Sequence, residues 1–207
     1  LANILARSAE CVFWLARQVE RADSLARILD VNAAYSHDIH GGQNWEGILK
    51  LYASEALFNE RYAVADAESV LRFYVLDRDN PGSIVASIMQ ARDNARTLRP
   101  LISTEMWEHI NRFYARMRAL KPRDLSAERL HELLSTVKEG CQTHFGITAE
   151  TFYHDEAWSF YLLGQQIERA DQTTRLLDTK YQALLPVPQD VGSQPDISQG
   201  NALLAST

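Results

Sequence analysis

Glutamate, arginine and aspartate recur at fixed spacing in two segments of this 207-residue chain. Residues 15–30 read LARQVERADSLARILD, and residues 163–178 read LGQQIERADQTTRLLD. Nine of the sixteen positions are identical at an offset of 148, and the charged ones are Glu20/Glu168, Arg21/Arg169, Asp23/Asp171, Arg27/Arg175 and Asp30/Asp178. A helix that only had to be amphipathic would repeat its pattern and not its charged residues. The chain therefore contains a duplicated element built on Glu-Arg-Ala-Asp (ERAD).

Helical periodicity predicts where the charges of each segment lie. Apolar residues from Leu15 to Leu29 form one core-facing stripe. Glu20 and Asp23 form a charged flank, on which Asp23 and Arg27 are spaced for an i,i+4 pair. Arg21 lies in an apolar arc on another side of the helix, and Arg169 has the same placement in the second segment.

A buried, unpaired guanidinium is very costly, so each of these arginines predicts an acidic or carbonyl partner on another helix. Glu20, Arg21, Asp23 and Arg27 with their counterparts Glu168, Arg169, Asp171 and Arg175 are candidate binding residues.

A second polar motif, Asp77-Arg78-Asp79-Asn80-Pro81-Gly82, resembles the start of a calcium loop in its spacing of acids and glycine. Position 5 is Pro81, which has no ligand side chain, and position 12 is Ile88 where a bidentate glutamate is needed. We therefore exclude calcium. The motif predicts a structured helix start in which Asp77 and Asp79 pair with arginines and Asn80 is the N-cap.

Other catalytic patterns are missing from the sequence. A di-metal helical bundle needs two Glu-x-x-His motifs, and only Glu128-Arg129-Leu130-His131 fits. There is no phosphate-binding glycine loop, no GxSxG, and neither Cys11 nor Cys141 lies in a recognisable catalytic motif. We expect no metal and no cofactor.

Composition narrows the classes of partner and compartment. The net charge of −6 argues against a nucleic-acid partner, and no apolar run is long enough for a membrane helix. The two cysteines have no CxxC spacing and are expected to be reduced core thiols in a cytoplasmic protein.

Every periodic segment has helical spacing, which predicts an all-α protein: an antiparallel bundle of six or seven helices. One helix is expected from Asn44 through Leu57, and another after the Asn80 cap. Residues 1–185 form the expected domain. Residues 186–207 are rich in Pro, Gly, Ser and Gln and are expected to be a linker, a tail or the start of a truncated second repeat. The chain is then a fragment of a longer two-repeat protein or has a shortened second half.

A truncated repeat would leave one face of the 155–184 helix uncovered. Leu162, Leu176 and Leu177 are the expected apolar patch. Self-association, or docking of residues 190–207, is expected there.

Several segments together resemble the bacterial alpha-E domain, an all-helical family named for its ER motif. They are the two ERAD segments with flanking FWLARQ and HDEAWSFYLLGQ, then LDRDNPGSI (76–84), ARDNARTLRP (91–100) and STEMWEHINRFY (103–114). The resemblance covers the chain to about residue 190. It implies an association with circularly permuted ATP-grasp ligases and transglutaminase-like peptidases, beside or fused to which family members are typically encoded.

Two functions follow from the residues and the resemblance. In the first, the chain is a non-catalytic partner or substrate-presenting module for an ATP-grasp amide ligase. In the second, it is an enzyme whose Glu/Asp/Arg clusters bind an amino-acid or peptide substrate, since arginine recognises carboxylates in a bidentate manner. A closed interface between the ERAD helices favours the first function, and an open polar cavity there favours the second.

Overall fold

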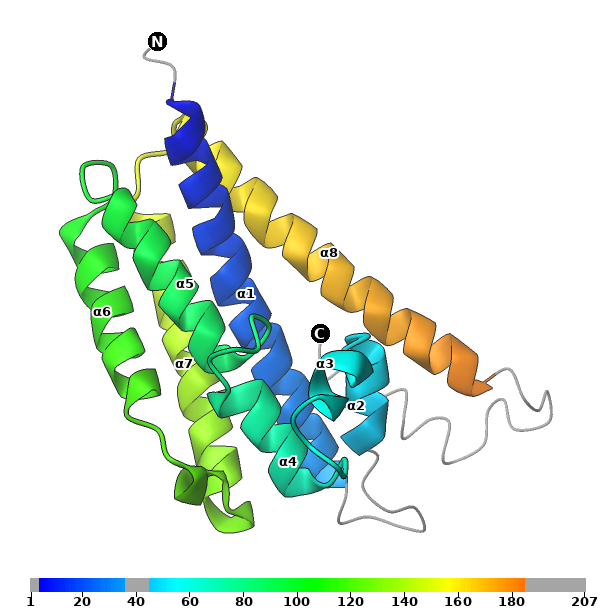
Figure 1. The fold of residues 1–207 in the computed structure, drawn as a ribbon. Coiled ribbons are helices and arrows are strands. Elements are labelled where there is room, and N and C mark those ends of the chain that lie inside the picture. Colours follow the sequence, from blue (N-terminus) through cyan, green and yellow to red (C-terminus); the bar gives the residue numbers. More distant parts are fainter. Residues whose placement is uncertain (1–3, 36–44, 185–207) are drawn as a thin grey trace.

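The computed structural model describes residues 4–35 and 45–184, and every regular element among them is helical (Figure 1). The α-helices are α1 (Ala6–Tyr35), α2 (Trp45–Leu51), α3 (Glu55–Asn59), α4 (Ala67–Leu71), α5 (Ile84–Thr97), α6 (Thr104–Arg118), α7 (Ala127–Thr151) and α8 (Glu156–Leu184). A π-helical turn, η1 (Arg72–Leu76), follows α4, and a 3₁₀ turn, η2 (Pro122–Leu125), precedes α7. The described residues thus form eight α-helices instead of the predicted six or seven. None of these helices is long and apolar enough to span a membrane.

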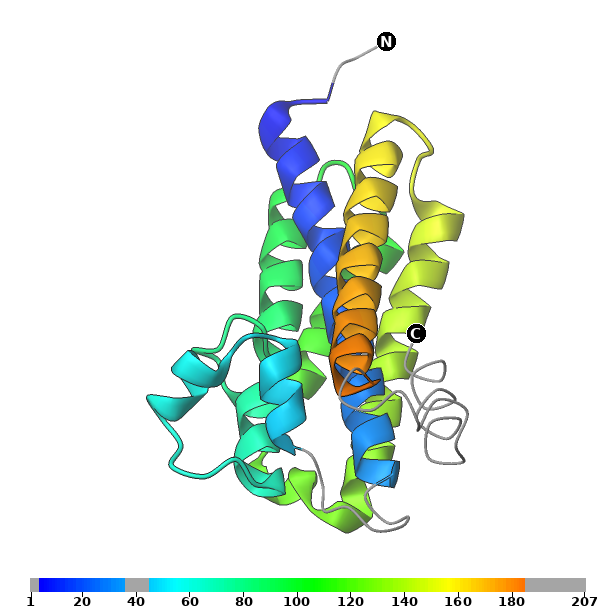
Figure 2. The ribbon, with the colours of Figure 1, turned by 90° about the vertical axis from the view of Figure 1, so that its right-hand side faces the viewer.

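Helix α1 lies at the centre of the molecule and packs against α5, α7 and α8 (Figures 1 and 2). Its apolar stripe is fully enclosed, since Val19, Ala22, Ala26 and Leu29 have no exposed surface. Arg17 contacts α8, and the stripe lies on the opposite side of α1. The stripe is therefore covered by α5 and α7.

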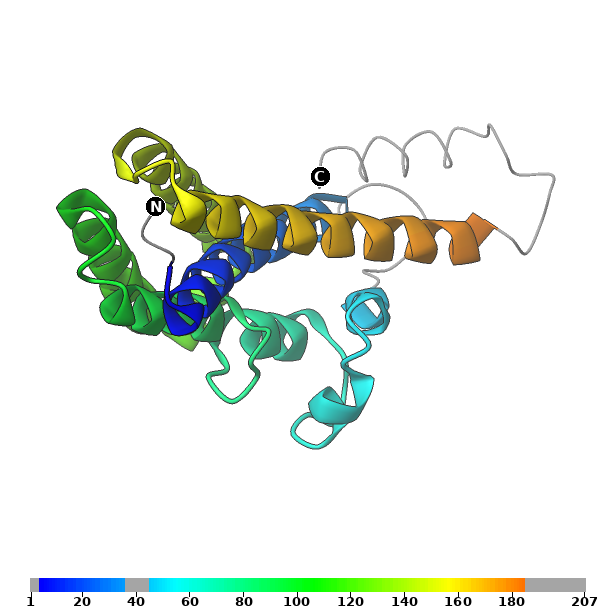
Figure 3. The same ribbon diagram turned by 90° about the horizontal axis from the view of Figure 1, so that it is seen from above.

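The first and last described helices run side by side in the same direction and diverge toward their C-terminal ends (Figures 1 and 3). They lie in close contact at Gly164, where an added Cβ atom would lie 2.3 Å from the backbone oxygen of Phe13. Only glycine fits at this point. Helices α5, α6, α7 and α8 alternate in direction along the chain (Figure 1).

The short helices depart from the sequence-based prediction. The single helix predicted to end at Leu57 is two helices, because Ala53 adopts a positive φ of 47° between α2 and α3. The proposed first residue of that helix, Asn44, lies outside the described residues.

Serine caps set the starts of α5 and α6. Ser83 and Ser103 each accept a hydrogen bond from the third residue of the following helix, the backbone N–H of Ala86 and Met106. The prediction that Asn80 caps α5 is therefore wrong. The Asn80 side chain instead donates to the backbone oxygen of Phe73 and accepts from the N–H of Gly82.

The patch predicted on α8 is only partly correct. Leu177 is 55% exposed, but Leu176 is buried against the core. The predicted linker or tail, residues 186–207, lies outside the described residues.

Candidate functional site

The two ERAD segments meet where α1 crosses α8, and each arginine binds the glutamate of the other segment. The Nε and Nη2 atoms of Arg21 lie 2.7 and 3.0 Å from the two carboxylate oxygens of Glu168. Arg169 contacts Glu20 through the same atoms at the same distances. The predicted acidic partner on another helix is confirmed for both arginines. The two bidentate ion pairs together are called the ER exchange below.

Burial within the ER exchange is the reverse of what the helical wheel predicts. The side chain of Glu168 is fully buried and that of Glu20 is 3% exposed, whereas Arg21 and Arg169 are 23% and 50% exposed. The wheel put the glutamates on a charged flank, but α8 covers that flank of α1. All four carboxylate oxygens accept hydrogen bonds from within the chain, so the glutamates are held in a closed interface.

The two halves of the ER exchange differ in how many donors serve the glutamate. Glu168 also accepts from Arg17 at 2.8 Å and from Gln172 at 3.1 Å. At an offset of 148, the residues matching Arg17 and Gln172 are Gln165 and Ser24. Among the described residues, Glu20 accepts side-chain hydrogen bonds from Arg169 alone. Burial acts to raise the pKa of Glu168, but Arg21 and Arg17 outweigh it and hold this pKa below its usual value.

The aspartates of the two segments pair within their own helices. Arg27 lies 2.9 Å from Asp23, and Arg175 lies 2.9 Å from Asp171. The predicted i,i+4 spacing is confirmed in α1, and α8 carries the same pair. Hydrogen bonding to Asp171 raises the pKa of Arg175.

The Asp77–Asn80 motif forms a structural loop separate from the ER exchange. Arg61 binds Asp77 at 2.7 Å and lies 3.7 Å from Asp79, which confirms the predicted pairing of these acids with an arginine. Arg78 is exposed. The hydrogen bonds of the loop stay within residues 61–90, and none reaches an ERAD residue.

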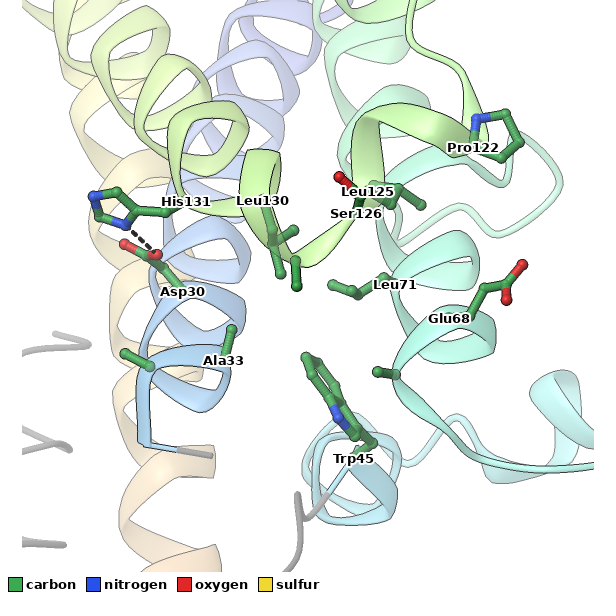
Figure 4. Close-up of a pocket in the computed structure, with 13 residues that line it drawn as sticks. Asp30, Ala33, Trp45, Glu68, Leu71, Pro122, Leu125, Ser126, Leu130 and His131 are labelled. Atoms are coloured by element: carbon green, nitrogen blue, oxygen red, sulfur yellow. Dashed lines mark hydrogen bonds and ion pairs between the residues drawn. The ribbon is translucent and has the colours of Figure 1, made fainter. Parts of the chain in front are cut away.

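A pocket of about 460 Å³ lies near the C-terminal end of α1, between α2, α4, η2 and α7 (Figure 4). Trp45, Leu71, Leu125 and Leu130 line it. None of the ERAD residues named as candidates does so. Most of the pocket lining is apolar, so the pocket suits an apolar group better than a charged one.

One polar cluster lies at the edge of this pocket, and the sequence-based candidates did not include it. Asp30 accepts from Lys138 at 2.6 Å and lies 2.8 Å from Nδ1 of His131 (Figure 4). Burial acts to raise the pKa of Asp30, but Lys138 and His131 lower it overall. The sequence did offer a signal for this cluster, because Asp30 is repeated as Asp178 at the offset of 148. His131 thus binds an aspartate of α1. This contact, and not a di-metal site, accounts for the histidine of the Glu-x-x-His motif.

Two histidines, His109 of α6 and His144 of α7, and the α7 cysteine Cys141 are buried. His144 has no exposed surface, and neither ring nitrogen has a hydrogen-bond partner. Burial lowers the pKa of His144 to about 3 and raises that of the Cys141 thiol. Cys141 is buried as predicted, whereas Cys11 is half-buried, and both are free. Among the residues that the structure describes, no three His, Cys, Asp or Glu side chains are placed to hold a metal ion.

Comparison with known proteins identifies relatives without a known activity. A family model described as a predicted alpha-helical domain with a conserved ER motif matches residues 4–207. Uncharacterised proteins of Mycobacterium bovis and Mycobacterium tuberculosis are 29% identical over 186 residues, which cover 80% of this chain. The chain spans only 21% of the length of these relatives. No solved structure matches it.

Proposed function

The chain belongs to the Alpha-E family, and we propose that it is a non-catalytic helical partner, or substrate-presenting module, of an ATP-grasp amide ligase. The ER exchange carries this proposal. Both glutamates are buried and bound by guanidinium groups of the same chain, so they are not free to bind a substrate or to transfer a proton. The motif that characterises the family therefore serves to join α1 to α8.

The choice of a ligase as partner rests on the resemblance to the alpha-E family. That resemblance implies an association with ATP-grasp ligases and transglutaminase-like peptidases. The chain itself supplies no nucleophile and base in contact and no phosphate loop among its described residues, the parts that an autonomous ligase needs. A binding module in the bacterial cytoplasm, where free cysteines stay reduced, agrees with these features.

We also infer that the molecule is an antiparallel bundle built around a duplicated helix. The alternating directions of α5, α6, α7 and α8 support the antiparallel bundle, whereas α1 and α8 run in the same direction (Figure 1). The reciprocity of the ER exchange supports the duplication, because each glutamate binds the arginine of the other segment with the same atoms. A duplicated helix that meets its own copy around a pseudo-two-fold axis would give this pattern.

A second candidate function is an enzyme that binds amino-acid or peptide substrates through the clusters. The exposure of Arg169, at 50%, favours it, because a substrate carboxylate could reach this guanidinium. To do so it must displace Glu20, whose side chain is nearly fully buried. Leaving such a carboxylate unpaired costs several kcal/mol, which makes this function the less favoured one.

Three parallel assays of ATP consumption test the proposal. They contain a circularly permuted ATP-grasp ligase alone, this chain alone, and the two mixed. We expect no turnover by the chain alone, and co-purification with the ligase or a changed ligase rate in the mixture. Arg169→Gln separates the two functions, with Arg112→Gln on the exposed face of α6 as the matched control. Turnover by the isolated chain that Arg169→Gln abolishes and Arg112→Gln preserves would establish the enzyme instead.

A further inference from the structure

Helix α8 carries an exposed apolar stripe with the spacing of a coiled-coil seam. Its large members Phe160, Leu163, Ile167 and Leu177 are 37, 49, 41 and 55% exposed. The exposed small residues Ala170 and Thr174 complete a 3-4-3-4-3 spacing. These six residues are called the α8 seam below.

The same stripe in α1 is a packing surface. At an offset of 148, the seam corresponds to Val12, Leu15, Val19, Ala22, Ala26 and Leu29, which are all at most 1% exposed. Helices α5 and α7 cover that stripe, whereas α8 packs along α1 and contacts α2 with its other side. Figure 2 shows α8 at the front of the molecule, with no described helix over it. The seam therefore has the composition of a buried interface and lacks a cover among the described residues.

The order of large and small residues makes the seam complementary to itself. When two α8 helices are placed antiparallel about a point between residues 168 and 169, Ile167 lies opposite Ala170 and Leu163 lies opposite Thr174. Phe160 then lies opposite Leu177 at both ends. Each large side chain in the middle faces a small one, which lets two helices approach closely. The hydroxyl of Thr174 donates to the backbone oxygen of Ala170, so it needs no partner across the interface.

Among the described side chains, the charges beside the middle of the seam are already paired. Arg169 binds Glu20, and Asp171 binds Arg175. Self-association therefore does not require an unpaired charge to lose its water, which is the usual obstacle to a homodimer at a polar surface.

We propose that a second copy of this chain covers the α8 seam, with the two α8 helices antiparallel and related by a two-fold axis at the level of residues 168 and 169. Such an interface is isologous and closes at the dimer. A seam one helix wide buries less than the roughly 800 Å² per partner of a standard interface. The dimer is therefore weak, with a dissociation constant in the micromolar range.

Sedimentation of the full chain across the micromolar range tests the dimer. We expect a concentration-dependent monomer–dimer equilibrium that Ile167→Gln shifts to the monomer. Leu101→Gln is the matched control, because Leu101 is 42% exposed in the turn between α5 and α6. It should leave the equilibrium unchanged. A monomer at every concentration, or an equal effect of both substitutions, would overturn the proposal.

Cysteine cross-linking tests the antiparallel register. Ile167→Cys and Ala170→Cys variants of different tag length are mixed and mildly oxidised. The register places these two positions opposite each other, so the mixed disulfide should form faster than either self-disulfide. Faster self-linking of each variant would show a parallel pair and contradict the proposed axis. This outcome is independent of any ligase, so it does not depend on the function proposed above.

Discussion

Arg21 and Glu168 are 147 positions apart in the sequence, yet the guanidinium of one lies 2.7 Å from the carboxylate of the other. The contact has its reciprocal in Arg169 and Glu20, so the first and last described helices are joined by a pair of equivalent ion pairs. Their energetic consequences differ, because their surroundings differ.

Arg169→Ala should destabilise the fold more than Arg21→Ala, although Arg169 is the more exposed arginine. Removal of Arg169 leaves Glu20 buried without its donor, at an expected loss of about 2–4 kcal/mol in the free energy of unfolding. Removal of Arg21 leaves Arg17 and Gln172 on Glu168, and the expected loss is about 1–2 kcal/mol.

Urea unfolding of these variants measures the order. Arg129→Ala is the control, since Arg129 is 58% exposed and pairs with Asp124 at the surface, and it should cost at most about 0.5 kcal/mol. Equal, small losses at all three positions would contradict a structural role for the ER exchange.

Substitutions of glycine should separate close packing from open space. Gly164→Ala puts a methyl group 2.3 Å from the backbone oxygen of Phe13, so it must push α1 and α8 apart, and we expect a loss of about 2–3 kcal/mol or more. Gly146→Ala, in α7, meets nothing within 4 Å and should stabilise by about 0.5–1 kcal/mol. Thermal unfolding checks both, and opposite signs are the decisive result.

The free energy of unfolding should decrease as the pH is lowered below about 6.5, the ordinary pKa of histidine. The unfolded chain protonates His144 in that range, whereas burial lowers its pKa in the folded chain to about 3. The free energy of unfolding is thus fully retained above pH 6.5 and decreases by up to about 1.4 kcal/mol per pH unit toward pH 3.

His144→Leu should reduce this slope between pH 6.5 and 5, a window above the ordinary pKa of the carboxylates. The slope that remains belongs in part to His109, whose pKa burial also lowers. Chemical unfolding at several pH values gives the slope directly. An unchanged slope in the variant would mean that His144 accepts its proton in the folded state.

Ala53→Gly should stabilise the protein by about 0.5–1 kcal/mol, because Ala53 has a φ of 47°, where glycine is favoured. The control is Ala56→Gly, three residues later inside α3, which should destabilise by a similar amount. Destabilisation by both substitutions would show that the turn between α2 and α3 does not strain Ala53.

The long helices could be predicted because their signals are local. The 3.6-residue periodicity and the serine before α6 are properties of a few neighbouring residues, and Ser103 caps that helix. The interrupted helix at Ala53 could not be predicted, since alanine is the strongest helix former and gives no sign of a positive φ. Asn80 misled because an asparagine before a proline is a good cap in isolation, whereas here the Phe73 backbone oxygen binds its side chain.

The ER exchange was predictable only in part. The sequence shows that Arg21 needs a partner, and the repeated segment offers the right acid. Which flank of α1 receives α8 depends on packing between residues about 150 positions apart, so the burial of Glu20 and Glu168 could not be inferred from one helix.

The ER exchange also bears on the order in which the chain folds. Helical proteins usually fold fast because their contacts are local, but the bonds between α1 and α8 join residues 147 to 151 positions apart. During synthesis on the ribosome, α1 is made well before α8. The carboxylate of Glu20 therefore stays hydrated until Arg169 has emerged. The buried face of α1 near Glu20 is therefore completed last, and the interval between the two helices is the period in which a nascent chain is most open to chaperones.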